Sequence, residues 1–537
     1  MLVSGIVSAD TLPISFITAQ CRNIQPIKIT ISDDLASDIH KFELQSLKIN
    51  NINDSINFLL HNKLSRDDKS PLVNCQILLA DNWNHFLESN TTQHFINQLN
   101  ASSRQYDHQL ARQLENAIQY QMTRAQKAQL RTYESMFRSE FLALKPRLKI
   151  IDKNCKLENS TSNDLLDEFE LTIARYLLHQ PDESCRKAVW ETYYQRNILK
   201  QPLLEIVDIR QYQATSKGFN DFTQFKLANN YLNNSELVEQ FLNRFTHSIN
   251  IAPWSVGQEL KSTVRHDFQI QNTQQLLVKS FNAFKTLGLN IETINNTVYR
   301  VWLHNRLLGD ITIDLSDKYK KIQSKLIRYP VIGYQFGQAS LSLPTELKSF
   351  RKVDSFVHKL SKIIAIFSDA TPLYLTSKSL NNNDYSKISD KWLAEYLFDQ
   401  LHIDSINKYP RQLLAKQYIE QLEILRAKVA LNLYRKNYLQ LDLDILFQDN
   451  FGAGISSDVS FPISFNGIIE LGPMYYQKLW QKKLGTYLYI QSKTQDKANY
   501  FFDVLVVNEQ RLSFQQQLEN LLTLDITPSK LIEELSY

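Results

Sequence analysis

Most of the chain repeats its hydrophobic residues with the period of an α-helix, and this pattern constrains the fold more than any other feature. After residue 106, for example, Leu110, Leu114 and Ile118 recur every fourth position, as on the buried face of a helix. Pro146 follows this stretch, and proline interrupts helices. The same reasoning predicts helical patches at 32–52 and 82–99, and helices over most of 164–265 and from 345 to the C-terminus. The sequence therefore predicts a mainly α protein.

One stretch, residues 297–343, changes to a period of two, which indicates β-strands. The expected strands are Val298–Trp302, Gly309–Leu315 and Tyr329–Phe336. The basic residues between the last two strands are expected to form the solvated face of a helix; they are Lys318, Lys320, Lys321, Lys325 and Arg328. The chain has no internal repeat, so we expect a helical body with one small β insert.

Size and charge exclude several classes of protein. The 537 residues, 43% of them hydrophobic, can bury a large core. A net charge of +4 is small for this length and gives no argument for binding nucleic acid. No run of 18 apolar residues exists, so we expect no membrane-spanning helix and no membrane partner.

The cysteines suggest a reducing compartment. Cys21, Cys75, Cys155 and Cys185 are far apart in the sequence and form no CxxC pair, so we expect free thiols. The N-terminal residues Met1–Ile6 lack the basic start of a signal peptide. We therefore expect a cytoplasmic protein, with export by another kind of signal left open.

An apolar helix, Val353–Phe367, follows the β insert and carries a single histidine, His358. Such a histidine is the first element of a His-Glu-x-x-His motif, in which two imidazoles one helical turn apart hold zinc and the glutamate activates a water. Here Lys359 stands at the glutamate position and Lys362 at the second histidine. None of the eleven histidines is followed by glutamate, so no other segment supplies the motif.

The order of several segments resembles the thimet oligopeptidase and oligopeptidase A family of zinc peptidases. The resemblance rests on Glu191–Arg196 with the following 209–222, Leu308–Leu315, Val353–Phe367, Tyr475–Trp480 and the tail Ser513–Leu535, and it covers roughly two-thirds of the chain. It implies a mainly α, two-lobed helical ellipsoid of the zincin type around a deep cleft, with a small sheet before the former metal helix. It also implies an N-terminal helical region, 1–160, and a metallopeptidase-like domain, 161–537, with the β insert at 297–343.

The family's third zinc ligand, a glutamate, corresponds to Lys387 in the segment Asp384–Lys391. An ammonium has no lone pair to give, and the three lysines Lys359, Lys362 and Lys387 would together repel a divalent cation. The family's glycine-rich run and histidine before its paired tyrosines are also absent, although Tyr475 and Tyr476 remain. The resemblance therefore implies the body of a peptidase without its metal site.

Each of these residues also has a plain structural explanation. His358 can pair with Asp354 one turn back, the lysines can face water or pair with Asp354, Asp390 or Glu395, and the tyrosines can be core or cleft-wall aromatics. Alternatively the lysines form a positive floor that favours an acidic peptide or a C-terminal carboxylate, with His358, Tyr475 and Tyr476 as further peptide contacts.

The leading hypothesis is an inactive peptidase homologue that binds a peptide or protein partner in its cleft and needs no cofactor. A peptide could add to the edge of the strand expected at Tyr329–Phe336 through main-chain hydrogen bonds. The alternative is an active metallopeptidase that holds zinc with His358, Asp354 and Asp384. A third possibility is an interaction protein that uses its outer helical surface. The sequence does not indicate the oligomeric state.

Overall fold

The computed structural model describes residues 12–61, 64–143, 155, 166–195, 197–379, 383–435, 442–456, 459–522 and 526–535. The segment Met1–Ile6, Pro146 and the domain boundary expected between residues 160 and 161 lie outside these ranges.

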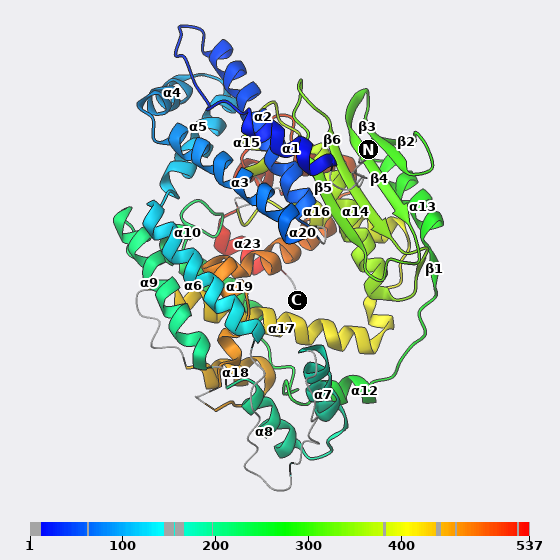
Figure 1. The fold of residues 1–537 in the computed structure, drawn as a ribbon. Coiled ribbons are helices and arrows are strands. Elements are labelled where there is room, and N and C mark those ends of the chain that lie inside the picture. The colour runs from blue at the N-terminus through cyan, green and yellow to red at the C-terminus, as the bar shows by residue number, and fades with distance from the viewer. Residues whose placement is uncertain are drawn as a thin grey trace, which may run out of the picture.

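Five N-terminal helices share one hydrophobic core. They are α1 (Leu12–Arg22), α2 (Leu35–Leu60), α3 (Arg66–Leu87), α4 (Asn90–Ala101) and α5 (Gln105–Gln119). Phe42, Phe95 and Leu110 are fully buried in this core. In Figure 1 these helices (blue) lie together at one end of the molecule, next to the edge of the sheet.

The rest of the chain forms the body of the molecule. Its first helices are α6 (Arg124–Ala143), α7 (Leu166–His179), α8 (Glu183–Tyr193), α9 (Lys200–Ser216), α10 (Phe222–Leu227), α11 (Ser235–Phe245), α12 (Val256–Ser262) and α13 (Thr273–Lys285). After the sheet follow α14 (Phe350–Ser368), α15 (Tyr374–Ser379), α16 (Ile388–Gln400), α17 (Pro410–Leu433), α18 (Leu443–Phe451), α19 (Gly467–Glu470), α20 (Gln477–Thr494), α21 (Ala498–Phe501), α22 (Phe514–Leu521) and α23 (Pro528–Glu534). The chain is thus mainly α, as predicted.

The β insert is a five-stranded sheet that precedes α14. Its strands are β2 (Leu289–Thr293), β3 (Val298–Leu303), β4 (Arg306–Leu315), β5 (Gln323–Arg328) and β6 (Gly337–Leu343), in the spatial order β2-β3-β4-β6-β5. Only β4 and β6 are parallel to each other. A separate pair, β1 (Gln271–Asn272) with β7 (Glu346–Leu347), closes the base of the insert.

Two of the three expected strands are confirmed, and one is wrong. Val298–Trp302 and Gly309–Leu315 lie in β3 and β4. Tyr329–Phe336 is instead the turn between β5 and β6, where Pro330 cannot donate a ladder hydrogen bond and Gly333 has φ 83°. The expected basic helix is also wrong, because its residues lie in the loop before β5 and in β5 itself.

A close contact fixes α14 on the sheet. A Cβ atom at Gly309 would lie 2.6 Å from the Phe367 ring, and one at Gly337 would lie 2.5 Å from it. The absence of both side chains lets the ring of Phe367, near the end of α14, rest directly on β4 and β6. Val353, Phe356 and Val357 are fully buried along the same helix. One side of α14 is therefore committed to the core.

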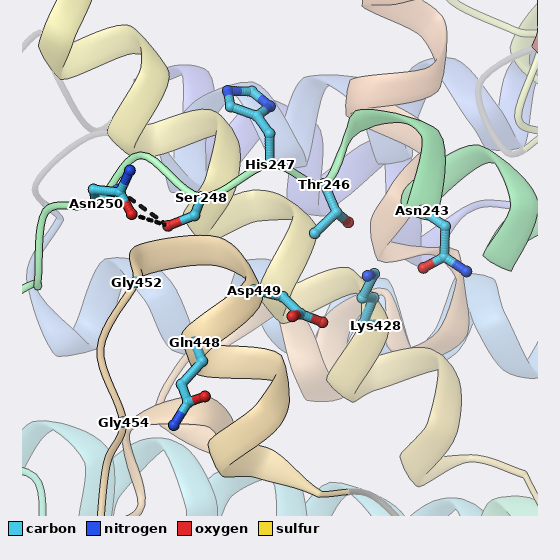
Figure 2. Close-up of a pocket in the computed structure, with 10 residues that line it drawn as sticks. All are labelled: Asn243, Thr246, His247, Ser248, Asn250, Lys428, Gln448, Asp449, Gly452 and Gly454. Atoms are coloured by element: carbon cyan, nitrogen blue, oxygen red, sulfur yellow. Dashed lines mark hydrogen bonds between the residues drawn. The ribbon is translucent and has the colours of Figure 1, made fainter.

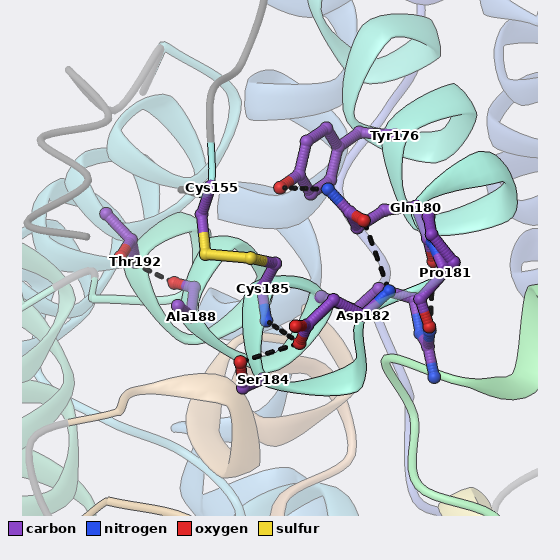
Figure 3. Close-up of a disulfide and its surroundings, with 10 residues drawn as sticks. Cys155, Tyr176, Gln180, Pro181, Asp182, Ser184, Cys185, Ala188 and Thr192 are labelled. Carbon is purple, nitrogen blue, oxygen red and sulfur yellow. Dashed lines mark hydrogen bonds between the residues drawn. A yellow bond between two sulfur atoms is a disulfide. The ribbon is translucent and has the colours of Figure 1, made fainter. Parts of the chain in front are cut away.

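Both pairs of cysteines form disulfides, so the expectation of free thiols is wrong. Cys21 in α1 is bonded to Cys75 in α3, with 6.0 Å between their Cα atoms. Cys155 is bonded to Cys185 in α8, beside the Asp182 cap of that helix (Figure 3). Separations of 54 and 30 residues gave no sign of this proximity, which only the folded chain creates.

The N-terminal helices meet the body through polar contacts of α2, one of which is buried. The carboxyl of Glu43, which has no exposed surface, accepts a hydrogen bond from the Tyr374 backbone N–H at 2.7 Å. The Tyr374 hydroxyl donates to Asp54 at 2.5 Å. His40 and Tyr334 form a further hydrogen bond at 2.6 Å. Among the described residues, no helix is both long and apolar enough to cross a membrane.

The junction carboxyl predicts a pH dependence of stability. Burial raises the pKa of Glu43 from its usual 4.5 to about 7, and the Tyr374 N–H opposes this only in part. The pKa of Glu43 is higher in the folded state than in the unfolded state. The contribution of this carboxyl to the free energy of unfolding is therefore fully present below pH 4.5 and is lost as the pH rises through about 7. Glu43→Gln should abolish this loss, which amounts to about 3 kcal/mol at most, and should raise the Tm at pH 8.

Thermal unfolding of both proteins from pH 4 to 9 checks this prediction, with Glu88→Gln at an exposed helix end as the control. An unchanged slope in Glu43→Gln would show that another group carries the pH dependence.

The disulfides predict the reactivity of the cysteines in the native cells. Acid quenching of these cells preserves the thiol state. After denaturation, the protein should react with a thiol reagent only if it is first reduced. By loop entropy, the 54-residue loop closed by Cys21–Cys75 contributes about 4 kcal/mol. The double variant Cys21→Ser, Cys75→Ser should therefore unfold at a lower temperature. Labelling before reduction would contradict the pairing.

Candidate functional site

Three helices build the region in which the resemblance places the metal site. α14 rests on the sheet, α16 packs along α14, and α20 packs along α16. Gly485 in α20 permits this last approach, because a Cβ atom there would lie 2.4 Å from the Cβ of Lys391. His358 and Lys359 lie half-buried on α14, outside its fully buried stripe, and Lys387 caps the start of α16. The structure thus brings together the positions that the motif predicted.

His358 is a half-buried imidazole. Its Nε2 lies 3.7 Å from Oδ1 of Asp354, the partner expected one turn back, which is too far for a hydrogen bond. Burial lowers the pKa of His358; Asp354 opposes this, and the Lys391 and Lys482 charges add to it. The ring meets Phe398 edge-on at 6.0 Å, and Nδ1 is buried without a hydrogen-bond partner among the described residues.

Several lysines and two carboxylates lie near this histidine. Burial lowers the pKa of Lys362, the Lys387 charge lowers it further, and Asp390 opposes both. Asp390 is itself 3.2 Å from Lys391. Within the described ranges, no ion pair involves Lys359, Lys362, Lys387 or Lys482. We call these four side chains the lysine cluster.

Sequence reasoning missed Lys482, the α20 member of the cluster. Burial lowers the pKa of Lys482, and so does the Lys416 charge, while Glu420 and Asp354 raise it. The sequence offered one indication of Lys482: it lies two residues after Trp480, on the helix that follows the paired tyrosines. Only the packing of α20 against α16 shows that it faces His358.

The carboxylate that the zinc-binding alternative requires is already occupied. Asp384 has no exposed surface, and it accepts hydrogen bonds from the N–H of Tyr231 at 2.8 Å and of Leu232 at 2.9 Å. Tyr476 OH donates to the same carboxylate at 3.0 Å. In the part of the chain that the structure describes, no three His, Cys, Asp or Glu side chains form a group that could hold a metal ion. His358, Asp354 and Asp384 therefore do not form a metal site here.

The paired tyrosines have different positions. Tyr476 is 1% exposed and bonded to Asp384, so the expectation that it contacts a peptide is wrong, because its ring is inside the core. Tyr475 is half-buried, and its ring packs on Phe465 and over Gly467, where a Cβ atom would lie 2.2 Å away. Of the two, Tyr475 remains available for a peptide contact.

The edge of the sheet is formed by a different strand from the one expected. Because Tyr329–Phe336 is a turn, the edge strand on this side of the sheet is β5, and β2 forms the opposite edge. Helix α2 packs against this strand, with Lys325 Nζ 5.2 Å from the centre of the Phe58 ring. An added peptide strand would have to compete with α2.

A hollow of about 470 Å³ lies between α5 and the body. Its lining includes Ser386 and Ser389, the sequence neighbours of Lys387, and Arg112 from α5 on the opposite side. The hydroxyl of Tyr231, also in the lining, is buried without a hydrogen-bond partner among the described residues. The hollow thus joins the start of α16 to the N-terminal helices.

No protein-family model matches the chain, and no curated protein matches it in sequence. Solved structures match its fold over nearly the whole length. A structure described as PZ peptidase A with an inhibitor is 10% identical, with 97% of this chain and 93% of that chain covered and a TM-score of 0.54. A putative peptidase from Chlamydophila abortus is 13% identical, with 98% and 96% covered and a TM-score of 0.55. The chain therefore has a peptidase-like helical fold.

The bond between Tyr476 and Asp384 predicts a stability effect. Tyr476→Phe removes one of three donors from a carboxylate whose pKa is raised by burial, and it should lower the free energy of unfolding by about 1 to 3 kcal/mol. Tyr475→Phe is the matched control, and it should leave stability nearly unchanged. Chemical denaturation at pH 7 measures both. Equal losses would show that the Asp384 bond contributes nothing.

Proposed function

We propose that the protein is a peptidase homologue without peptidase activity, which binds a peptide or protein partner and needs no metal. The observation that carries this proposal is the lysine cluster. Lys359, Lys362 and Lys387 occupy the positions where the resemblance places the catalytic base and two zinc ligands. The Lys387 charge acts on Lys362, and the Lys482 charge acts on His358. Four ammonium groups repel a divalent cation and supply no lone pair. We also propose that the chain is a degenerate member of the thimet oligopeptidase and oligopeptidase A family.

The same charges favour an anionic partner. Lys359, Lys362 and Lys387 have no carboxylate partners among the described residues, so a bound carboxylate would relieve their mutual repulsion. Such a group is present in acidic side chains and at the C-terminus of every peptide. We therefore propose that an acidic peptide or a peptide C-terminus binds at the lysine cluster.

The neighbouring hollow supports a site for more than one residue of the partner. Ser386 and Ser389 flank Lys387 and line this hollow, in which Arg112 adds a further positive charge. The Tyr231 hydroxyl can donate to a carbonyl or a carboxylate there. A partner chain with its carboxylate on the lysine cluster can thus continue between α5 and the body, with Tyr475 as a candidate contact.

The cysteines bear on where the protein works. The expectation of a cytoplasmic location rests in part on free thiols, and the two disulfides remove that support. Disulfides persist in oxidising compartments, so we propose that the chain matures in one. The thiol labelling described above distinguishes the two locations.

Binding of fluorescent peptides tests the proposal. An acidic peptide with a free C-terminus should bind more tightly than a neutral, amidated one. The triple variant Lys359→Gln, Lys362→Gln, Lys387→Gln should lose at least about tenfold in affinity, or about 1.4 kcal/mol. The control variant Lys217→Gln, Lys320→Gln, Lys321→Gln removes the same charge from exposed positions and should bind normally.

Metal analysis and a quenched-peptide cleavage assay on the same preparation complete the test. The expected result is no stoichiometric zinc and no cleavage. One zinc per chain together with turnover, both lost in His358→Ala, would establish the active metallopeptidase instead. Equal affinities of the two triple variants would point to a partner surface away from the lysine cluster.

A further inference from the structure

A second hollow, of about 710 Å³, lies away from the lysine cluster. It is formed by the end of α11, the loop that follows it, α17, and the end of α18 with the loop after it (Figure 2). Side-chain amides, hydroxyls and charged groups dominate its lining. Two of these groups, Lys428 and Asp449, carry opposite charges.

Lys428 is a buried cation without a matching anion. Its side chain comes from α17 and is 7% exposed. Burial lowers the pKa of Lys428, and Asp449 and Glu239 oppose this only in part. Glu239 is committed to Arg435, with 2.6 Å between the paired atoms. A buried charge without a partner is costly, so the position favours a ligand that supplies one.

Asp449 offers the opposite charge from α18. Its carboxylate is exposed and has no hydrogen bond or ion pair among the described residues. Figure 2 shows its side chain and that of Lys428 extending toward the same space between α17 and α18. The two groups influence each other electrostatically but are not within ion-pair distance. The space between them therefore suits a molecule with both a negative and a positive group.

The wall of the hollow is fixed by backbone geometry. Asn250 has φ 53°, and its Oδ1 accepts a hydrogen bond from Ser248 Oγ at 3.0 Å. Gly452, with φ 69°, passes so close that a Cβ atom there would lie 2.7 Å from Asn250 Oδ1. Such a wall presents its amide and hydroxyl groups in set positions, which reduces the entropy lost when a polar ligand binds.

We propose that this hollow binds a small zwitterion of the amino-acid type, with its carboxylate on Lys428 and its ammonium on Asp449. A simple anion would be repelled by Asp449, and a simple cation by Lys428. The polar lining disfavours an apolar ligand. This inference does not depend on the peptide site, because it uses different residues.

Thermal shift and calorimetry with each of the twenty common L-amino acids and with glycylglycine test this proposal. At least one probe should raise the Tm, whereas acetate and methylammonium, which carry one charge each, should not. Lys428→Met and Asp449→Asn should each weaken binding of that probe at least about tenfold. The exposed substitutions Lys217→Met and Asp208→Asn are the matched controls.

Lys428→Met removes a buried charge, so the ligand-free variant should be as stable as the parent or more so. Asp449→Asn changes an exposed group and should not affect folding. It therefore still tests the proposal if Lys428→Met folds poorly. The proposal is overturned if no probe binds, if acetate binds as well as the amino acids, or if Asp449→Asn binds like the parent.

Discussion

The contact of the Phe367 ring with Gly309 and Gly337 fixes the geometry on which the rest of the site depends. It sets the distance and rotation of α14 relative to the parallel strands β4 and β6. Once this face is committed, His358 and Lys359 are left on the side that meets α16. A larger residue than glycine at either strand position would push the ring away and turn the whole helix. The sheet thus positions the two cluster lysines of α14, Lys359 and Lys362.

Helix packing then concentrates like charges that water would otherwise separate. Gly485 lets α20 approach α16, and this approach brings Lys482 toward His358. Burial and neighbouring lysine charges lower the pKa of both Lys362 and Lys482, although Lys362 keeps an exposed surface and Lys482 is half-buried. A fold gains no stability from such an arrangement. The energetic cost is understandable if an anionic partner offsets it when bound, which links the electrostatics of the site to the proposed function.

Periodicity predicted the helical body, the strands β3 and β4 and the placement of His358, because these features are local. It failed at Tyr329–Phe336, where the apolar character comes from contacts with α2 and α15 and not from strand pairing. The disulfides, Lys482 and the burial of Tyr476 depend on segments that are distant in sequence. The spacing of residues along the sequence does not indicate which distant segments come into contact. The resemblance predicted which residues to examine, and packing decides which of them are accessible.

The positions of α14 and α16 are fixed by contacts within the protein. The apolar face of α14 holds the helix on the sheet without help from any ligand, and Val353, Phe356 and Val357 are fully buried there. The start of α16 is held separately, since Asp384 ties the segment before it to Tyr231, Leu232 and Tyr476 by hydrogen bonds. Neither helix needs zinc to reach its position. The frame around the lysine cluster is therefore held by contacts that do not involve Lys359, Lys362 or Lys387.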